Sequence, residues 1–443
     1  MRWSVQASLL VQGQSKPKHF TRDAAGWLSN GIASLFPFPA LPFRLRPGAE
    51  LEPSSELSST SNASRRPRMD YFKSLSSAVL AKAGGPFPNF SLGEKQTKFE
   101  GRTIWSLYDG TKRDDGTPCS IFVFDAAQQP RSLLPLAQNA ARKLRIMRHP
   151  NVLKFIDSAE TATAVYVATE RVKPLSTMLE DATGGSSSAS SQVEWVGWGL
   201  SRLANALKFI NVDASSVHGN VRIETIFLSA GGEWRLGGFE LLTSTKEEAG
   251  IFYTMGNILP DSSRIFPPEA KQGGTQALKG MPAHMADSYG LALAAFEAYN
   301  GTLPPTTSVP PQGKVPANIY AMLKKMLTPN AKTRASTTQF LESGIAEGGY
   351  FQTNRLVQVA AGIDNFMLAS EPERAFVMKR VASIAHLIIS ETDRYFLAGS
   401  WRRLQNHFQR HSFNTKFYQS CLTRFRIPRI LKASRQHLSK GRS

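Results

Sequence analysis

The chain has 443 residues, a formal net charge of +19 and two cysteines. This length leaves room for two or three domains. No apolar run is long enough to span a bilayer, and Cys119 and Cys421 lie far apart, without the spacing of metal ligands. The composition therefore predicts reduced thiols, as in the cytosol, and no transmembrane segment, disulfide framework or zinc site.

The positive charge is concentrated at the two ends of the chain. Residues 1–68 contain 9 Lys and Arg against 4 Asp and Glu, and residues 394–443 contain 12 Lys and Arg and no acidic residue. The middle, residues 69–393, is nearly neutral, with 32 basic and 30 acidic residues. Basic ends of this kind favour a nucleic acid or another acidic surface as a partner.

Residues 1–68 are predicted to be disordered. LFPFPALPFRLRPG is interrupted by prolines, and SSELSSTSNASRRPR is a polar low-complexity run. The N-terminus lacks a basic segment followed by an apolar core, so a signal peptide is not expected. Residues 1–22 resemble a transit peptide only faintly. Met69 begins MDYFKSLSSAVLAKAGG, a predicted amphipathic helix that ends at Gly84-Gly85. A second start of the protein at Met69 is our hypothesis.

Strands, one helix and further strands follow. TIWSLYDGTKRDDGTPCSIFVFD predicts two strands around a polar turn, and SLLPLAQNAARKLRIMRHPN predicts a helix from its apolar spacing. HPNVLKFID and AVYVATERV predict strands, and GGSSSASS at 184–191 predicts a flexible loop. VEWVGWGLSRLANALKFI predicts a helix with one apolar face, and helices dominate from residue 285 onward.

The stretch HGNVRIETIFLSAGGEWRLGGFE, residues 218–240, predicts a loop followed by a β-hairpin. Two runs rich in β-branched and aromatic residues flank Gly231-Gly232, and glycine tolerates the positive φ of a tight hairpin turn. A loop, a hairpin and then a short Phe-containing motif form the catalytic core of a protein kinase. Together with the strands before it and the helices after it, this order predicts an α+β, two-lobed protein-kinase-like fold.

The residues that phosphoryl transfer requires are absent from the matching positions. Phe122 stands where the phosphate-binding strand Lys belongs, and Ala140 stands where its helix Glu partner belongs. Asn220 replaces the catalytic Asp and cannot accept a proton as Asp does. Thr225 and Gly238 occupy the two magnesium-binding positions. We therefore expect Phe122 to fill the nucleotide space, and we expect no catalytic residue, cofactor site or metal site.

The segment SLGEKQTKFEGRTIW offers only Gly93 and Gly101 where a phosphate-binding loop needs several glycines. It predicts an ordinary β-hairpin. Glu240 is expected to be a solvated loop residue. The alternative is an atypical kinase with residual ATP binding, in which Lys98 or Lys112 replaces the missing Lys and Glu240 binds the metal ion.

Four residues that hold a kinase fold together are present. His218 begins the loop, and Glu269 follows Pro267-Pro268 in the manner of the Ala-Pro-Glu motif. Arg334 is expected to pair with Glu269, and Asp287 is expected to cap the backbone of the loop. Removing one partner of a buried ion pair costs about 3–5 kcal/mol, so these residues are predicted to be structural.

These motifs make the chain similar to the Scyl, or N-terminal-kinase-like, pseudokinase family, which includes a cytoplasmic tRNA-export factor. The resemblance covers about residues 69–380. It is carried by MDYFKSLSSAVLAKAGGPFP, IWSLYDGTK, SIFVFD, LRIMRHPNVLKFID, HGNVRIETIFLS, WRLGGFELL and GGYFQTNRLVQVAAGIDNFML. It implies an inactive kinase-like lobe pair followed by stacked HEAT-type helices, and adaptor roles in tRNA nuclear export and COPI-type Golgi–ER traffic.

The expected domains are a disordered extension (1–68), a pseudokinase N-lobe (69–173), a pseudokinase C-lobe (174–345), the start of a HEAT-like helical region (346–393) and a basic tail (394–443). The helical region has room for about one helix pair, whereas a solenoid needs several. The abrupt loss of acidic residues after Asp393 indicates an out-of-frame or intron-derived tail. In the alternative, the tail is a basic arm that binds RNA.

The sequence therefore predicts a catalytically inactive kinase-like scaffold in the cytoplasm, peripheral at the Golgi or the nuclear pore. Its expected partners are tRNA-export or COPI coat proteins, with a tRNA or RNA contact in addition. The chain ends Lys440-Gly441-Arg442-Ser443, without a dilysine ending that binds coat proteins. The alternatives are the atypical kinase and an RNA-binding protein that acts through its tail.

Overall fold

The computed structural model describes residues 87–183, 189–303 and 309–386 together with residues 399, 403 and 404. All of them belong to one compact unit, Tyr71–Ser443. The extension 1–68, the helix predicted after Met69 and most of the basic tail lie outside the described residues.

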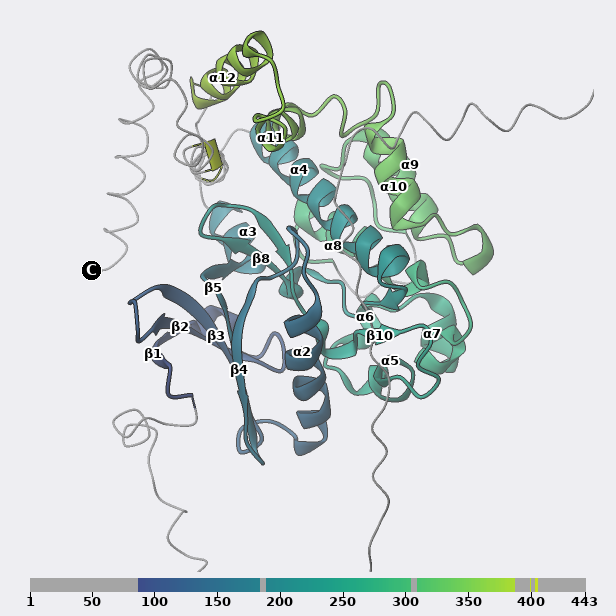
Figure 1. Ribbon diagram of the computed structural model, residues 1–443. Helices are drawn as coiled ribbons and strands as arrows, with labels where there is room; N and C mark the ends of the chain where they lie inside the picture. Colours follow the sequence, from purple (N-terminus) through teal and green to yellow (C-terminus); the bar gives the residue numbers. More distant parts are fainter. Residues whose placement is uncertain (1–86, 184–188, 304–308, 387–398, 400–402, 405–443) are drawn as a thin grey trace, which may run out of the picture. The chain divides into compact units, whose positions relative to one another are not determined.

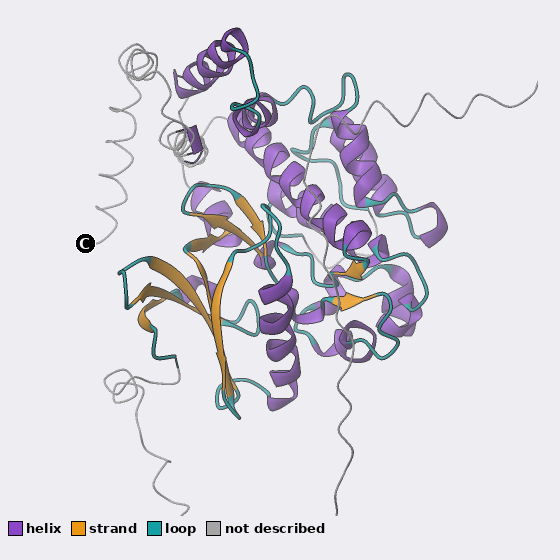
Figure 2. Ribbon diagram, viewed as in Figure 1, coloured by secondary structure: helices purple, strands orange, loops and turns teal. Residues whose placement is uncertain are grey.

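The N-terminal lobe is built on a five-stranded antiparallel sheet with the strand order β1-β2-β3-β5-β4 (Figures 1 and 2). Its strands are β1 Phe90–Lys95, β2 Ser106–Lys112, β3 Pro118–Asp125, β4 Phe155–Glu160 and β5 Ala164–Glu170. The pair β2 and β3 is the predicted one, joined by the Asp-Gly-rich turn. Helix α2, Leu134–Ile146, packs against β4 and β5.

Helix α2 forms where the apolar residues recur at helical spacing. Leu136, Ala137, Ala140 and Leu144 are buried on the face that it turns towards the lobe. The helix ends at Ile146, earlier than the predicted run to residue 151. A reason lies in His149-Pro150, because a residue before proline is driven away from the α conformation.

The C-terminal lobe is mainly helical and carries two small antiparallel sheets. Its strands are β6 Val172–Pro174, β7 Ser216–Val217, β8 Ile226–Ser229, β9 Trp234–Leu236 and β10 Thr243–Ser244. Its helices are α3 Leu175–Thr183, α4 Ala189–Lys208, α5 Ile251–Met255, α6 Ser262–Ile265, α7 Pro268–Gly273, α8 His284–Asn300, α9 Ala317–Met326, α10 Thr337–Ile345, α11 Arg355–Asp364 and α12 Glu371–His386. Short 3-10 turns lie at Thr97–Phe99, Arg131–Leu133, Ile223–Thr225, Phe239–Leu241, Gly256–Ile258, Thr275–Leu278 and Ala331–Thr333, and Phe209–Asp213 form a π-helical turn.

The predicted hairpin at residues 223–239 is confirmed, since β8 pairs with β9. Gly232 adopts a φ of +76°, a conformation that glycine reaches without steric cost. The loop predicted at 184–191 is shorter than expected, because α4 already begins at Ala189. Residues 184–188 lie outside the described residues.

Helix α8 is the centre of the C-terminal lobe. It is buried on nearly all sides, and it packs against α4, α9 and α10. A helix that is apolar all round has to lie inside a core. The main cluster of buried side chains runs from the N-terminal sheet through α4 and α8 to α11 and α12.

The sheet-rich N-terminal lobe and the helical C-terminal lobe confirm the predicted α+β, two-lobed, kinase-like fold. Helices α11 and α12 follow the lobes, pack against each other and, through α11, contact α4. They lie where the sequence predicts the start of a HEAT-type region. In the part of the chain that the structure describes, no helix is long and apolar enough to cross a membrane.

An ion pair joins the first turn of α7 to the loop before α10. The two guanidinium nitrogens Nη1 and Nη2 of Arg334 donate to the two carboxylate oxygens of Glu269, the second over 2.9 Å. Arg334 also donates to the backbone oxygens of Thr328 and Met285. Its side chain is fully buried, so its charge depends on these acceptors.

We expect Glu269→Ala to lower the free energy of unfolding by about 3–5 kcal/mol, because it leaves the buried Arg334 charge without its carboxylate. Thermal or denaturant unfolding of the full chain measures this. The matched control is Asp181→Ala, which breaks the exposed Lys98–Asp181 pair and costs at most about 1 kcal/mol. Equal effects of the two substitutions would show that the Arg334–Glu269 pair is not structural.

Candidate functional site

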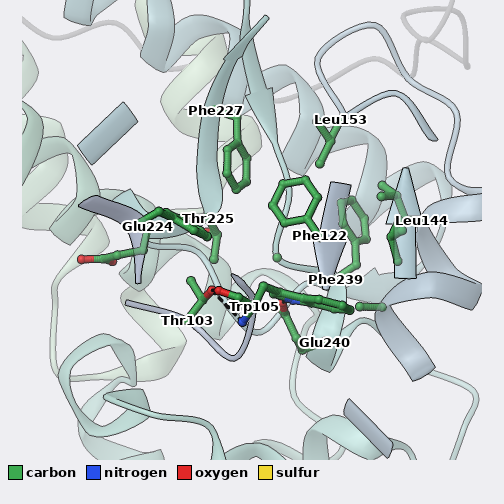
Figure 3. Close-up of a pocket in the computed structure, with 14 residues that line it drawn as sticks. Thr103, Trp105, Phe122, Leu144, Leu153, Glu224, Thr225, Phe227, Phe239 and Glu240 are labelled. Atoms are coloured by element: carbon green, nitrogen blue, oxygen red, sulfur yellow. Dashed lines mark hydrogen bonds between the residues drawn. The ribbon is translucent and has the colours of Figure 1, made fainter. Parts of the chain in front are cut away.

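Phe122 lies on β3 and points into the space between the lobes, where a kinase holds its nucleotide (Figure 3). Its ring meets the ring of Phe227 on β8 edge to face, with 5.3 Å between the centroids. The indole of Trp105 meets Phe122 from another direction, at 6.3 Å. Aromatic rings from both lobes therefore occupy the centre of the site.

Phe99 adds a fourth ring to this cluster. It belongs to the 3-10 turn Thr97–Phe99 in the connection between β1 and β2, and its ring centroid lies 5.9 Å from that of Phe227. β1 and β2 pair as a hairpin, as predicted, but the connection between them is more than an ordinary turn. It places a buried phenyl ring in the segment where a kinase has its phosphate-binding loop.

The cavity that remains between the lobes measures about 30 Å³. That is the volume of about one water molecule, whereas sites for small-molecule ligands measure about 300–1,000 Å³. The lining side chains are Phe99, Thr103, Trp105, Phe122, Ala140, Leu144, Leu153, Val167, Glu224, Thr225, Phe227, Phe239 and Glu240, together with Gly238. None of these residues is a Lys or Arg that could pair with a phosphate.

Glu240 is buried, and the prediction of a solvated loop residue is wrong. Its side chain is 2% exposed. Trp105 Nε1 donates to its Oε1 over 2.6 Å, and Asn220 Nδ2 donates to its Oε2 over 2.7 Å. A carboxylate can be buried when hydrogen bonds replace its water. Both oxygens already accept a hydrogen bond, so Glu240 does not present a free oxygen to a metal ion.

Asn220 stands at the position of the catalytic Asp, and its side-chain amide supplies a hydrogen-bond donor to the buried Glu240 carboxylate. Because a carboxylate only accepts hydrogen bonds, the Asn220 amide nitrogen must face Glu240. An Asp at the same position would bring two carboxylates into hydrogen-bond distance at a buried site.

Gly238 has a left-handed conformation, with φ +76° and ψ 45°. A Cβ at this position would lie 2.5 Å from the side chain of Thr225. The Thr225 hydroxyl lies 2.9 Å from the backbone oxygens of Asn220 and Arg222 and accepts from the Arg222 N–H. The two positions that would bind magnesium in a kinase are thus packed against each other here.

Ala140 lines the small cavity from α2 and offers no carboxylate. Its neighbour Asn139, which the sequence reasoning missed, makes the contact between α2 and the segment after Gly238. Asn139 Nδ2 lies 3.0 Å from the backbone oxygen of Glu240 and 3.2 Å from that of Leu242. The only signal in the sequence was a polar residue beside the apolar face of α2.

His218 is buried and uncharged. Its Nδ1 accepts a hydrogen bond from the Asn220 N–H, so the ring proton sits on Nε2, which donates to the Gly237 oxygen over 2.8 Å. Burial lowers the pKa of His218 to about 4. The ring also packs on Phe239, with 5.1 Å between the centroids. These contacts describe a side chain that supports the loop.

Asp287 on α8 accepts hydrogen bonds from the backbone of the same loop. The backbone donors are His218 N at 2.8 Å and Gly219 N at 2.7 Å, and the side-chain amide Nδ2 of Asn211 adds a third hydrogen bond at 2.6 Å. Burial raises the pKa of Asp287 to about 6, against these hydrogen bonds. Gly219 has a φ of +74°, and a Cβ there would lie 2.5 Å from Phe252. The kinase pattern has an Arg at this position, which this loop conformation does not accommodate.

Lys98 and Lys112 lie away from the cavity. Lys98 is 65% exposed and pairs with Asp181 over 2.8 Å, and Lys112 pairs with Asp114. Neither is in the position that the atypical-kinase alternative requires. Within the described ranges, no group of His, Cys, Asp and Glu side chains could hold a metal ion.

Comparison with known proteins finds no matching family model. Several known proteins are similar to this chain, among them three from a slime mould and two yeasts. A Dictyostelium discoideum protein named probable inactive serine/threonine-protein kinase scy1 is 29% identical over 71% of this chain and 36% of its own length. The protein kinase domain-containing protein ppk3 of Schizosaccharomyces pombe is 29% identical over 72% of this chain and 46% of its own length. The cytoplasmic export protein 1 of Saccharomyces cerevisiae is 30% identical over 36% of this chain and 19% of its own length.

The chain therefore spans less than half the length of the relatives that it matches. Two independent lines agree on the family. The relatives carry the names of kinase-like and inactive-kinase proteins, and the kinase motifs lie in order on a two-lobed α+β fold. The chain is thus similar to proteins named SCY1, SCY1-like and inactive kinase scy1, which supports the SCY1-like pseudokinase family.

Proposed function

We propose that the two lobes, residues 69–345, act as a catalytically inactive scaffold whose nucleotide site is filled by the protein's own side chains. The observation that supports this most is the buried hydrogen-bonded chain Trp105–Glu240–Asn220 beside the aromatic cluster. It joins the residue that precedes β2 to the loop and to the segment after β9. The cluster and this chain leave a cavity of about 30 Å³ between the lobes.

The arrangement also lacks the groups that phosphoryl transfer needs. Catalysis of this reaction depends on positioned cations around the phosphates and on a residue that orients the attacking hydroxyl. The cavity has no lysine or arginine in its lining, and Asn220 does not accept a proton. The atypical kinase would need Lys98 or Lys112 to move from the surface and Glu240 to give up both of its donors.

We expect ATP, with or without magnesium, not to change the melting temperature of the full chain at millimolar concentration. A ligand at a hundred times its dissociation constant stabilises a protein by about 2.7 kcal/mol, which a thermal-shift titration detects. A magnesium-dependent rise in melting temperature would contradict the filled site. A phosphotransfer assay would then be the next measurement.

We expect Asn220→Asp to lower the free energy of unfolding by about 3–5 kcal/mol at neutral pH, because it places a second carboxylate against Glu240 in a buried site. The double variant Asn220→Asp with Glu240→Gln reverses the donor and the acceptor and is expected to recover most of that loss. Chemical denaturation of the four proteins in the cycle gives the coupling energy. Additive effects, or an unchanged stability of Asn220→Asp, would count against this bridge.

We further propose that the scaffold serves tRNA export or COPI-type vesicle traffic, as a cytoplasmic protein peripheral at the nuclear pore or the Golgi. The name of the relative cytoplasmic export protein 1 supports the first of these roles. Its partners would be proteins of these systems, with an RNA contact through the basic tail. The tail beyond residue 404 contains nine Lys and Arg and no acidic residue, which suits phosphate binding.

The start of this tail is attached to the fold. Arg403 Nη1 lies 3.0 Å from Asp364 Oδ1, and its Nη2 lies 3.0 Å from Glu233 Oε1. Leu404 is fully buried in the main core. A truncation after residue 404 therefore removes basic residues while it keeps these contacts.

Deleting residues 405–443 is expected to abolish the salt-sensitive affinity of the full chain for tRNA. Affinity that comes from phosphate contacts falls steeply between about 50 and 200 mM salt, because bound counterions are released. Filter binding or fluorescence anisotropy at several salt concentrations measures the slope. A truncated chain with unchanged affinity and slope would locate RNA binding elsewhere or remove it from the proposal.

A further inference from the structure

The N-terminal sheet has two apolar faces, and α2 packs on one of them (Figure 2). Side chains alternate between the faces along β3. Phe122 and Phe124 belong to the core that the sheet shares with α2, whereas Cys119 and Ile121 belong to a separate cluster on the other face. An antiparallel sheet that packs on one side commonly turns polar residues outward on the other. Here the second face, which we call the outer face, is apolar as well.

The strand register extends the outer face across the sheet. Opposed residues of antiparallel strands point to the same side, so Tyr108 on β2 and Ala168 on β5 share the face of Ile121, which lies between them. The apolar side chains of the outer face include Leu92, Tyr108, Cys119, Ile121, Val123 and Tyr166. Among the described residues, no helix contributes a side chain to this cluster.

The outer face is buried in the middle and open towards its borders. Ile121 is fully buried, Tyr108 and Tyr166 are half-buried, and Leu92 is 44% exposed. A groove of about 570 Å³ lies at one border, between the turn before β1 and Ile156 on β4. Apolar area and free space on the same face indicate that a further element covers it.

The described part of the chain begins on this face. Phe87 is its first residue. The Phe87 ring stacks on the ring of Phe90 with 4.4 Å between the centroids, and it lies 6.1 Å from the ring of Tyr166. Pro88 and Phe90 line the groove. The residues directly before Phe87 are therefore joined to the outer face beside the open groove.

The sequence directly before Phe87 is predicted to form an amphipathic helix. Within residues 71–83 the apolar side consists of Phe72, Leu75, Val79 and Ala83, at spacings of three and four residues. Ser77 falls on the opposite side. A helix of this length measures about 20 Å. A five-stranded sheet with strands about 4.8 Å apart is about 19 Å wide, so one such helix crosses the whole face.

We propose that residues 71–83 form a helix that packs with its apolar side on the outer face of the N-terminal sheet. Gly84-Gly85 ends the helix and leads the chain back to Phe87. Three observations favour this segment as the occupant: its attachment at Phe87, its length and its apolar side. The N-terminal lobe then has three layers, with the sheet between α2 and this helix. The proposal does not depend on the inactive scaffold function.

The test is amide hydrogen exchange of the full chain, read by mass spectrometry in peptides that cover residues 71–83. We expect exchange at least about tenfold slower than in an unstructured peptide of the same sequence, because docking protects the helix amides. Val79→Asp places a charge on the apolar side, and it is expected to bring exchange to within about twofold of the unstructured rate. The matched control Ser77→Asp places the same residue on the opposite side, and it is expected to keep the protection.

A substitution on the sheet tests the other half of the contact. Ile156→Asp places a charge at the groove, and it is expected to remove the protection of residues 71–83 as Val79→Asp does. The control Val212→Asp changes a side chain of the C-terminal lobe that is 55% exposed, and it is expected to have no effect there. Peptides from β3 and β5 report in the same data whether the sheet stays folded. If Ile156→Asp unfolds it, the exposed Leu92→Asp takes its place.

Fast exchange of residues 71–83 in the unaltered chain would overturn the proposal. So would protection that persists in Val79→Asp. Protection that rises with protein concentration would assign the outer face to a second copy of the chain. Protection that appears only with vesicles of phosphatidylcholine and phosphatidylserine would assign the segment to a membrane surface, and both results contradict the proposal. The inactive scaffold is tested separately, because the ATP titration and the Asn220–Glu240 cycle report on the space between the lobes.

Discussion

The carboxylate of Glu240 is the group on which the interlobe region depends. It is buried, and it is satisfied by one donor from the N-terminal lobe, Trp105, and one from the loop of the C-terminal lobe, Asn220. A buried charge of this kind is tolerated only while its hydrogen bonds are complete. The positions of β2, the loop and the segment after β9 are therefore coupled through one side chain. Asn139 adds a second connection, from α2 to the same segment.

This coupling gives a physical reason for the joint absence of kinase residues. Once one catalytic residue is lost, the other catalytic residues are no longer needed and can change. This explains why the kinase residues are absent, but it does not explain which residues replaced them. Here the replacements contact one another. Asn220 supplies the amide that Glu240 needs, and Gly238 leaves the space that the Thr225 side chain fills. Restoring an Asp at Asn220 or at Gly238 would disturb a neighbour at once. The residues at the former catalytic positions therefore form a new set of mutual contacts, and they are more than random replacements at positions without a function.

Sequence reasoning anticipated the parts of this structure that depend on local patterns. The hairpin around Gly231-Gly232 and the apolar face of α2 follow from spacing and turn chemistry over a few residues. The burial of Glu240 was not predicted, because its hydrogen-bond donors Trp105 and Asn220 are 135 and 20 positions away in the chain. No local sequence pattern indicates such distant donors. Phe99 was missed for a similar reason. Its segment was compared with a phosphate-binding loop, and the missing glycines do not tell where the phenyl ring goes.

A filled interlobe site also changes what the rest of the molecule can do. An active kinase has to open and close around its nucleotide, so its surfaces move with the catalytic cycle. In this chain the aromatic cluster and the Glu240 bridge occupy that space, and the loop from His218 to Thr225 is held by Asp287 and by its own hydrogen bonds. The same loop carries Arg222 and Glu224 into the wall of a cavity in the C-terminal lobe. A scaffold that is already ordered loses little freedom when a partner binds, which favours binding without any chemical step.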